Sequence, residues 1–267
     1  MRVPVSLADV MTVCPFEPDF APAIVSPSPN FNARAGGRDP DMLVLHYTGM
    51  PDGAGALSWL RAAESGVSSH YLVEENGDVH QLVPERARAW HAGVSHWQGE
   101  SDNNSRSIGI EIVNPGHDST GHYPDFPPGQ IEAVVKLCHD CARRWSIRPE
   151  RVLAHSDIAP LRKRDPGERF PWQQLAAAGI AHHVEPSPIG GGRFLQRADR
   201  GQPVEVLQAM LALYGYGVEV NGVFDELTEA CVIAFQRHFR PLRVDGVADR
   251  STIETLHRLI AALDRST

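Results

Sequence analysis

The sequence predicts an α/β fold, with a mixed central sheet flanked by helices, followed by a small three-helix domain. Three observations lead to this prediction. Short apolar runs typical of strands are interleaved with helical patterns through the first 180 residues. A stretch rich in Pro and Gly then interrupts regular structure. Beyond it, three helical patterns alternate with two similar loops.

The first domain is expected to cover residues 1–180. Its N-terminal arm, residues 1–40, is rich in Pro, Asn and Gly and is expected to be irregular. Residues 70–83 predict a β-hairpin, because two strand-like runs flank an Asn-Gly turn. A long helix is expected at 128–145, with a Pro in its opening turn. The other expected elements are strands at 42–47, 107–113 and 151–155 and a helix at 56–65.

Residues 181–193 are expected to form a linker, because Pro-x-Pro followed by three glycines favours neither helix nor strand. We expect this linker to hold the next domain loosely and its histidines, His182 and His183, to be solvated. The second domain, residues 194–267, is expected to be helical. Its loops at 221–225 and 244–249 each lead to an Asp near a helix start, which suggests a duplicated helix–loop unit. The helices are expected at 204–214, 227–239 and 251–263.

Composition excludes several classes of protein. Lys and Arg total 25 against 33 Asp and Glu, so the formal net charge of -8 lacks the basic footprint of a nucleic-acid-binding protein. No run of about 18 apolar residues predicts a transmembrane helix. Four cysteines in a chain of 267 residues do not make a disulfide scaffold. Cys138 and Cys141 are three apart on a predicted helix, where two buried thiols are favoured over a zinc or redox pair.

Two histidines at the ends of predicted strands are candidates for a site. His46 ends one strand and His155 ends another, where a sheet supplies the scaffold and loops supply access. A charged loop follows His155, and two His with one carboxylate would suit a catalytic zinc with an open fourth position. The alternative is a structural cluster of ordinary loop ion pairs. Glu111 stands among β-branched residues, where a carboxylate is costly to bury, so it is a candidate general base.

Several separate segments resemble the AmpD/AmiD group of zinc-dependent N-acetylmuramoyl-L-alanine amidases. They occur in the order of that family and cover residues 42–175. The matching segments are VLHYTGM, SSHYLVEENGDVHQLV, AWHAGVSHWQG, NNSRSIGIEIVNPG, FPPGQI and LAHSDIAPLRKRDPGERFPW. The second domain resembles the three-helix peptidoglycan-binding module through Gly215-Tyr216, the two similar loops and Phe235-Gln236.

The resemblance implies one zinc ion held by His46, His155 and Asp165, with Glu111 as the catalytic acid/base and Lys163 stabilising the oxyanion. The implied reaction is hydrolysis of the amide between the lactyl group of N-acetylmuramic acid, or its 1,6-anhydro form, and L-alanine. Zinc would polarise the carbonyl, and Glu111 would take a proton from the attacking water. The implied partner is peptidoglycan or a muropeptide, and we expect a monomer.

Four residues are weaker candidates for substrate contact. Trp90, His91 and Ala92 would shape the wall of a groove, with core packing as the alternative. Asn114 follows the Glu111 strand and would bind peptide or sugar, with turn capping as the alternative.

Two other functions stay open from the sequence alone. A peptidoglycan-recognition protein that binds without cleaving is disfavoured by the intact set of implied catalytic residues. A zinc hydrolase for an unrelated amide is disfavoured by the wall-binding domain. The compartment also stays open, because a wall-binding domain suggests the periplasm whereas the lack of a recognisable signal peptide suggests the cytoplasm.

Overall fold

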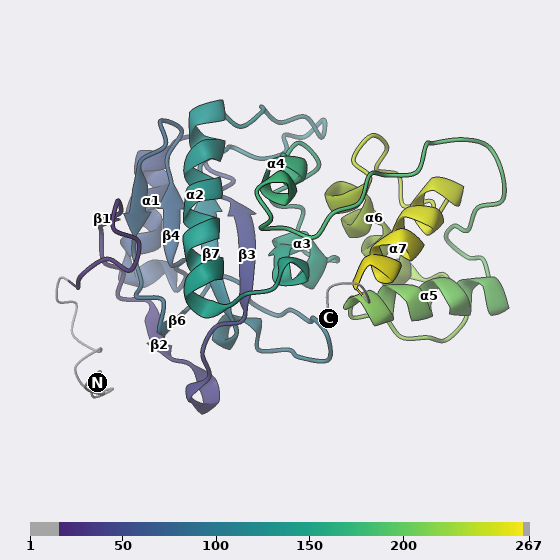
Figure 1. The fold of residues 1–267 in the computed structure, drawn as a ribbon, viewed down its shortest axis with the longest axis horizontal. Helices are drawn as coiled ribbons and strands as arrows, with labels where there is room; N and C mark the ends of the chain where they lie inside the picture. Colours follow the sequence, from purple (N-terminus) through teal and green to yellow (C-terminus); the bar gives the residue numbers. More distant parts are fainter. Residues whose placement is uncertain (1–15, 264–267) are drawn as a thin grey trace. The chain divides into compact units, whose positions relative to one another are not determined.

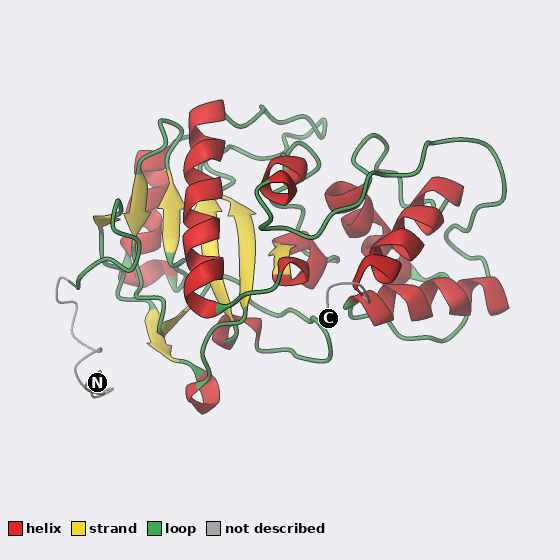
Figure 2. Ribbon diagram, in the orientation of Figure 1, coloured by secondary structure: helices red, strands yellow, loops and turns green. Residues whose placement is uncertain are grey.

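A computed structural model describes residues 16–263 of the chain (Figures 1 and 2). In this part, no helix is long and apolar enough to cross a membrane. The strands are β1 (Ile24–Val25), β2 (Phe31–Ala33), β3 (Met42–Tyr47), β4 (Tyr71–Val73), β5 (Val79–Gln81), β6 (Ala87–Ala89), β7 (Ser107–Ile112) and β8 (Val152–Ala154). The α-helices are α1 (Gly53–Arg61), α2 (Pro128–Trp145), α3 (His155–Ile158), α4 (Trp172–Ala177), α5 (Gln202–Tyr214), α6 (Glu226–Phe239) and α7 (Arg250–Leu263).

The central sheet is mixed. Its strand order is β1-β5-β4-β7-β3-β8, and β2 pairs with β6 in a separate two-stranded sheet. The β3–β7 and β7–β4 pairs are parallel, whereas β4 and β5 form an antiparallel hairpin. The predicted hairpin around the Asn-Gly turn is therefore confirmed. The Glu74 N–H donates to Asp78 O and closes the turn.

Helices cover both faces of this sheet. In Figure 1, α2 lies across the sheet in front of β7. Side chains alternate between the two faces of a strand. Tyr71 of β4 donates a hydrogen bond from its hydroxyl to Glu85, which also accepts from Cys141 of α2. The next residue, Leu72, packs instead in a cluster with Ala56 and Leu60 of α1.

A buried carboxylate holds α2 in place. Glu85 is fully buried and accepts hydrogen bonds from the Arg144 guanidinium at 2.7 and 2.8 Å and from Trp145 Nε1 at 2.5 Å. The ion pair with Arg144 and the hydrogen bonds from Tyr71, Cys141 and Trp145 satisfy the lone pairs of Glu85. A buried charge requires such partners.

The contacts divide the chain into two compact units. One contains the residues before 94 together with 104–148, and the other contains 94–103 together with 149 onward. The second unit therefore joins the helices α5–α7 to the segment that carries α3 and α4. The domain boundaries that we predict at 180 and 194 stay predictions.

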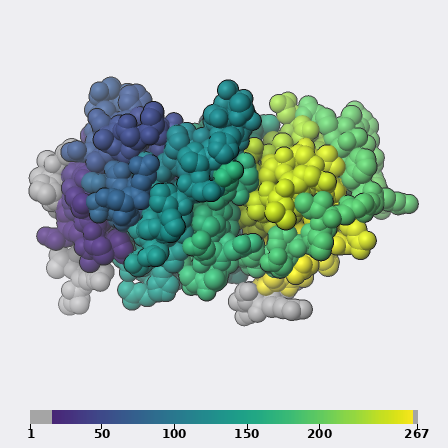
Figure 3. Space-filling model, turned by 90° about the horizontal axis from the view of Figure 1, so that it is seen from above, coloured from purple at the N-terminus to yellow at the C-terminus, as the bar shows by residue number. Residues whose placement is uncertain are grey.

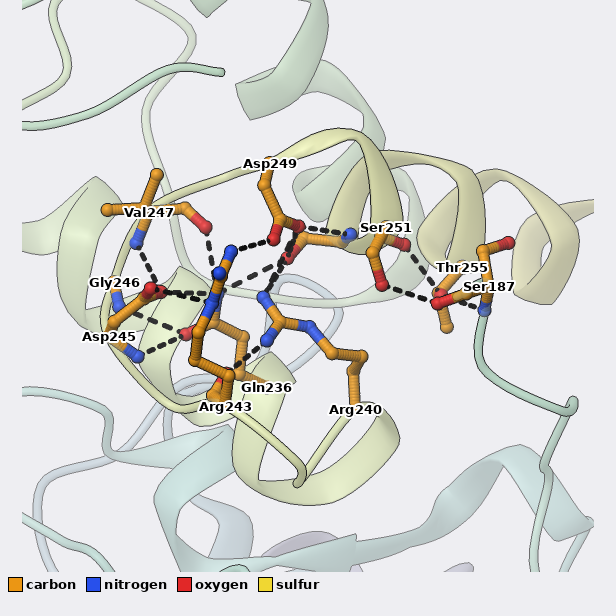
Figure 4. Close-up of polar contacts among 11 residues, drawn as sticks. Ser187, Gln236, Arg240, Arg243, Asp245, Gly246, Val247, Asp249, Ser251 and Thr255 are labelled. Atoms are coloured by element: carbon orange, nitrogen blue, oxygen red, sulfur yellow. Dashed lines mark hydrogen bonds and ion pairs between the residues drawn. The ribbon is translucent and has the colours of Figure 1, made fainter. Parts of the chain in front are cut away.

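The helices α5–α7 confirm the predicted helical pattern and the predicted duplication. The Gln208 side chain of α5 accepts from the backbone N–H groups of Asn221 and Gly222, and it donates to Val223 O and Thr228 Oγ1. The Gln236 side chain of α6 repeats these bonds with the second loop (Figure 4). The corresponding partners there are Asp245, Gly246, Val247 and Thr252. Each loop is thus closed by a glutamine from the preceding helix.

Part of the segment between the two predicted domains is packed, which the expectation of a loose attachment did not foresee, whereas residues 188–193 are exposed as a linker would be. Ser187 is buried, with its N–H bonded to Thr255 Oγ1 and its carbonyl accepting from Ser251 Oγ. In Figure 3 the yellow atoms of α7 lie against the green atoms of this segment. His182 lies 2.9 Å from the Tyr214 hydroxyl and is half-buried, as is His183, so neither is fully solvated. Burial lowers the pKa of both imidazoles.

Other differences from the predicted elements are short segments. Within the N-terminal arm, β1 and β2 are regular, and the part before residue 16 lies outside the described residues. The sequence patterns also missed β6, α3 and α4. The prediction of buried thiols is confirmed for Cys138 and Cys141, which are free and fully buried. Burial raises the pKa of Cys138 to about 12, which keeps this thiol protonated.

Candidate active site

The ends of two parallel strands place His46 beside Glu111. The two residues are direct partners in the β3–β7 register, so their side chains project from the same face of the sheet. Leu72 is the β4 partner of Glu111 and packs against α1, so this is the face that α1 covers. His46 is buried, whereas Glu111 is half-buried. An imidazole and a carboxylate therefore project from neighbouring positions near the ends of the two strands.

His91 orders the His46 ring. Its Nδ1 lies 3.0 Å from His46 Nε2, and its Nε2 lies 3.2 Å from Ser107 Oγ. The two rings are edge-on to each other, with centroids 5.1 Å apart. Gly109 makes room for this arrangement, because a Cβ there would lie 2.4 Å from the His91 ring. The role of His91 next to His46 was not foreseen from the sequence.

His155 and Asp165 are brought together by the short helix α3 and the loop that follows it. His155 is the first residue of α3, and its Nδ1 lies 2.9 Å from Asp165 Oδ2. The Ser156 N–H donates to the Asp165 carbonyl at 3.0 Å, which ties the loop back to the helix. Both side chains are buried, with exposed fractions of 3% and 8%.

His46, His155 and Asp165 form a possible metal site. Their ligand atoms all lie within 4.8 Å of one another, and no other group of three such side chains in residues 16–263 meets this criterion. Ligand atoms of a tetrahedral zinc site with bonds of ~2.0–2.2 Å are roughly 3.3–3.6 Å apart. Two imidazoles and one carboxylate are a donor set that zinc accepts while keeping an open position. The residues therefore fit the ion.

The other predicted site residues lie in different environments. Lys163 is half-buried, and its backbone N–H donates to the Ala159 carbonyl. Trp90 is half-buried and donates from Nε1 to Asn32 Oδ1 at 2.8 Å. Ala92 is fully buried. Substrate contact by Trp90, His91 and Ala92 stays a prediction.

Asn114 closes a turn in this structure. It is 2% exposed, its side-chain amide donates to Pro124 O, and its Oδ1 accepts from the Gly116 N–H. These bonds match the turn-capping alternative, and substrate contact by Asn114 stays a prediction.

Asp157 is a buried carboxylate close to His155 that the sequence analysis did not single out. It lies in α3, two residues after His155, and is fully buried. Its partners include Tyr216 and His238, which are 59 and 81 residues away in the chain. No local sequence signal marks a pairing over that separation.

Two family models match the chain. The N-acetylmuramoyl-L-alanine amidase model matches residues 36–168. A peptidoglycan binding domain model matches residues 200–256.

Known proteins of the same kind are similar over most of the chain. The N-acetylmuramoyl-L-alanine amidase AmiD of Escherichia coli is 41% identical over 223 residues, which are 79% of this chain and 79% of that protein. The 1,6-anhydro-N-acetylmuramyl-L-alanine amidase AmpD of Escherichia coli is 36% identical, over 56% of this chain and 87% of that protein.

A solved structure of AmiD from Escherichia coli is also similar. It holds the substrate anhydro-N-acetylmuramic acid-L-Ala-D-gamma-Glu-L-Lys, and it superimposes with a TM-score of 0.73 at 38% identity. The match covers 86% of this chain and 92% of that one.

Proposed function

Because the chain belongs to the N-acetylmuramoyl-L-alanine amidase family, we propose that it uses one zinc ion to cleave the amide between N-acetylmuramic acid and L-alanine. The grouping of His46, His155 and Asp165 carries this proposal. Muropeptides with a 1,6-anhydro sugar are the proposed substrates, since that is the substrate named for the AmiD complex.

The three side chains would hold zinc through two neutral imidazoles and one carboxylate. Since His46 Nε2 lies 3.0 Å from His91 Nδ1, one of these two atoms carries the shared proton. We assign it to His46, which leaves His46 Nδ1 as the ligand atom. A hydrogen bond of this kind fixes the tautomer and orientation of a ligand histidine. His91 would thus be a positioning residue.

When bound, zinc polarises the amide carbonyl as a Lewis acid and makes water a nucleophile near neutral pH. Glu111 would accept the proton of the attacking water and then deliver it to the nitrogen of the leaving L-alanine. This role is supported by the β3–β7 register, in which Glu111 and His46 project from the same face of the sheet. The Lys163 ammonium would stabilise the negative charge that develops on the carbonyl oxygen.

The C-terminal helices would bind peptidoglycan, as the matching domain model suggests. We propose an amidase domain at 1–180, a connecting segment at 181–193 and a binding domain at 194–267. We also propose that the enzyme is a monomer, which sedimentation analysis would check.

The test is hydrolysis of a purified anhydro-muropeptide beside whole sacculi, with products identified by mass spectrometry. The expected products are the free anhydro sugar and the intact stem peptide, together with one zinc per chain by elemental analysis. Chelation should abolish turnover, and added zinc should restore it. Full turnover by metal-free protein would contradict the proposed centre, and binding of sacculi without cleavage would indicate a recognition protein instead.

A further inference from the structure

We propose that Tyr216 and His238 are positioning residues for the metal ligand His155, and that they act through the buried carboxylate of Asp157. This inference rests on the proposed function, because it assumes that His155 binds zinc. It gives the C-terminal helices a role in the metal centre besides any contact with peptidoglycan.

The Asp157 carboxylate is held by three donors. Its Oδ1 accepts from the Tyr216 hydroxyl at 2.7 Å. Its Oδ2 accepts from His238 Nδ1 at 2.7 Å and from the Ala154 N–H at 2.8 Å. An ionised carboxylate only accepts hydrogen bonds, so His238 carries its proton on Nδ1. With Asp157 fully buried, no solvent replaces these donors.

The same carboxylate fixes the backbone on both sides of His155. Asp157 lies in α3 after His155, and the Ala154 N–H that it accepts belongs to the residue before His155. A shift of the carboxylate would therefore move the junction between β8 and α3, and with it the imidazole of His155. The movement would also reach Asp165, since Ser156 is bonded to the Asp165 carbonyl.

Both donors are held rigidly. The His238 ring is stacked against Trp172 and Phe239, each with a centroid distance of 3.7 Å. Tyr216 packs edge-on against the fully buried Trp97, with centroids 5.1 Å apart. Gly215 permits this approach, because a Cβ there would lie 2.5 Å from the Trp97 ring. Rigid donors keep the carboxylate in one position, which is what a ligand-bearing turn requires.

The test compares two tyrosines of the full-length protein. Tyr216→Phe removes only the hydroxyl that reaches Asp157. Tyr214→Phe is the matched control, since Tyr214 is also buried and its hydroxyl is bonded to His182 instead. The zinc dissociation constant is measured by competition with a chromogenic chelator, and Tm is measured beside it. We expect Tyr216→Phe to weaken zinc binding about tenfold, the size typical of an outer partner of a ligand, with Tyr214→Phe unchanged.

A second pair of variants checks the histidine. His238→Asn keeps an N–H donor near the position of Nδ1 and should retain most of the zinc affinity, whereas His238→Phe keeps the ring and should lose about tenfold. Zinc affinity equal to wild type in Tyr216→Phe and His238→Phe, with only Tm lowered, would overturn the inference while leaving the proposed centre intact. A wild-type protein that binds no zinc would overturn both.

Discussion

The strand ends of the sheet and the loops of the C-terminal helices use polar side chains in opposite ways. At the strand ends, the ladder satisfies the backbone, so His46 and Glu111 project from a pairing that does not depend on their side chains. In the helical region, the glutamines Gln208 and Gln236 satisfy loop N–H groups that have no ladder partner.

This difference separates chemistry from stability. A substitution at a strand end should change the reaction while leaving the fold intact. A substitution of either glutamine leaves two loop N–H groups without their partner, one of them on a buried glycine, and should change the stability first. The variants below test this separation, in order of decreasing expected effect.

Glu111→Gln should lower kcat by about 10²–10⁴-fold, because an amide cannot take the proton of the attacking water. Zinc content and Tm should stay at the wild-type values, since the backbone pairing of β7 is unchanged. Steady-state hydrolysis of an anhydro-muropeptide, with elemental analysis, checks both. Wild-type turnover in Glu111→Gln would mean that the base lies elsewhere.

Lys163→Met should lower kcat by about 10²–10³-fold, as expected when one oxyanion partner is lost. KM should change less, because the charge that the ammonium stabilises develops only in the transition state. Lys163→Arg serves as the control and should recover part of the rate. If Lys163→Met raised KM and left kcat unchanged, Lys163 would be assigned to substrate binding instead.

Gln236→Ala should destabilise the protein by about 2–4 kcal/mol, because the N–H groups of Asp245 and Gly246 lose their hydrogen-bond acceptor. Gln208→Ala should have a similar cost, since its bonds to the first loop are equivalent. Urea unfolding measures both. The control is Gln173→Ala on the exposed surface of α4, which should stay within about 0.5 kcal/mol. If Gln236→Ala or Gln208→Ala folded but had a lower kcat, the glutamines would affect the reaction as well as the stability, contrary to this expectation.

The smallest effect is expected at Asp225 and Asp249, which accept backbone hydrogen bonds at the starts of α6 and α7, and it concerns stability in acid. Burial opposes ionisation of Asp249, but bonds from Thr252 and the charges of Arg240 and Arg243 hold its pKa below the ordinary value of 3.8 (Figure 4). A lowered pKa in the folded state stabilises the protein above pH 3.8, and this stabilisation is lost as the pH falls below 3.8.

Asp249→Asn should therefore flatten the acid limb of a plot of stability against pH. Asp225→Asn should flatten it less. Burial opposes ionisation of Asp225 as well, and the Thr228 bonds that lower its pKa are joined by the charge of one arginine, Arg197, whereas Asp249 pairs with two. Equal acid sensitivity in both variants would show that the arginines add nothing to this effect.

Much of this architecture could be predicted because its signals are local. The helix α2 begins and ends where the pattern of apolar residues and the Pro at its start indicate. The hairpin follows from the Asn-Gly turn, and the two similar loops predicted the duplicated unit in which the structure places the repeated glutamine bonds. His46 and His155 were recognisable as candidates because they lie at the ends of predicted apolar strands, where a sheet supplies the scaffold and loops supply access.

The sequence by itself therefore determined the long helices and the main strands, the duplicated unit and the candidate ligands His46 and His155, but not the short elements β1, β2, β6, α3 and α4. Only the tertiary structure decided which side chains support them. His91 reaches His46 across 45 residues, and His238 reaches Asp157 across 81. Packing also buried Ser187 within the Pro- and Gly-rich connection, where it is bonded to Thr255. Local patterns record the conformation of neighbours in the chain, whereas these contacts depend on which surfaces are brought together when apolar area is buried.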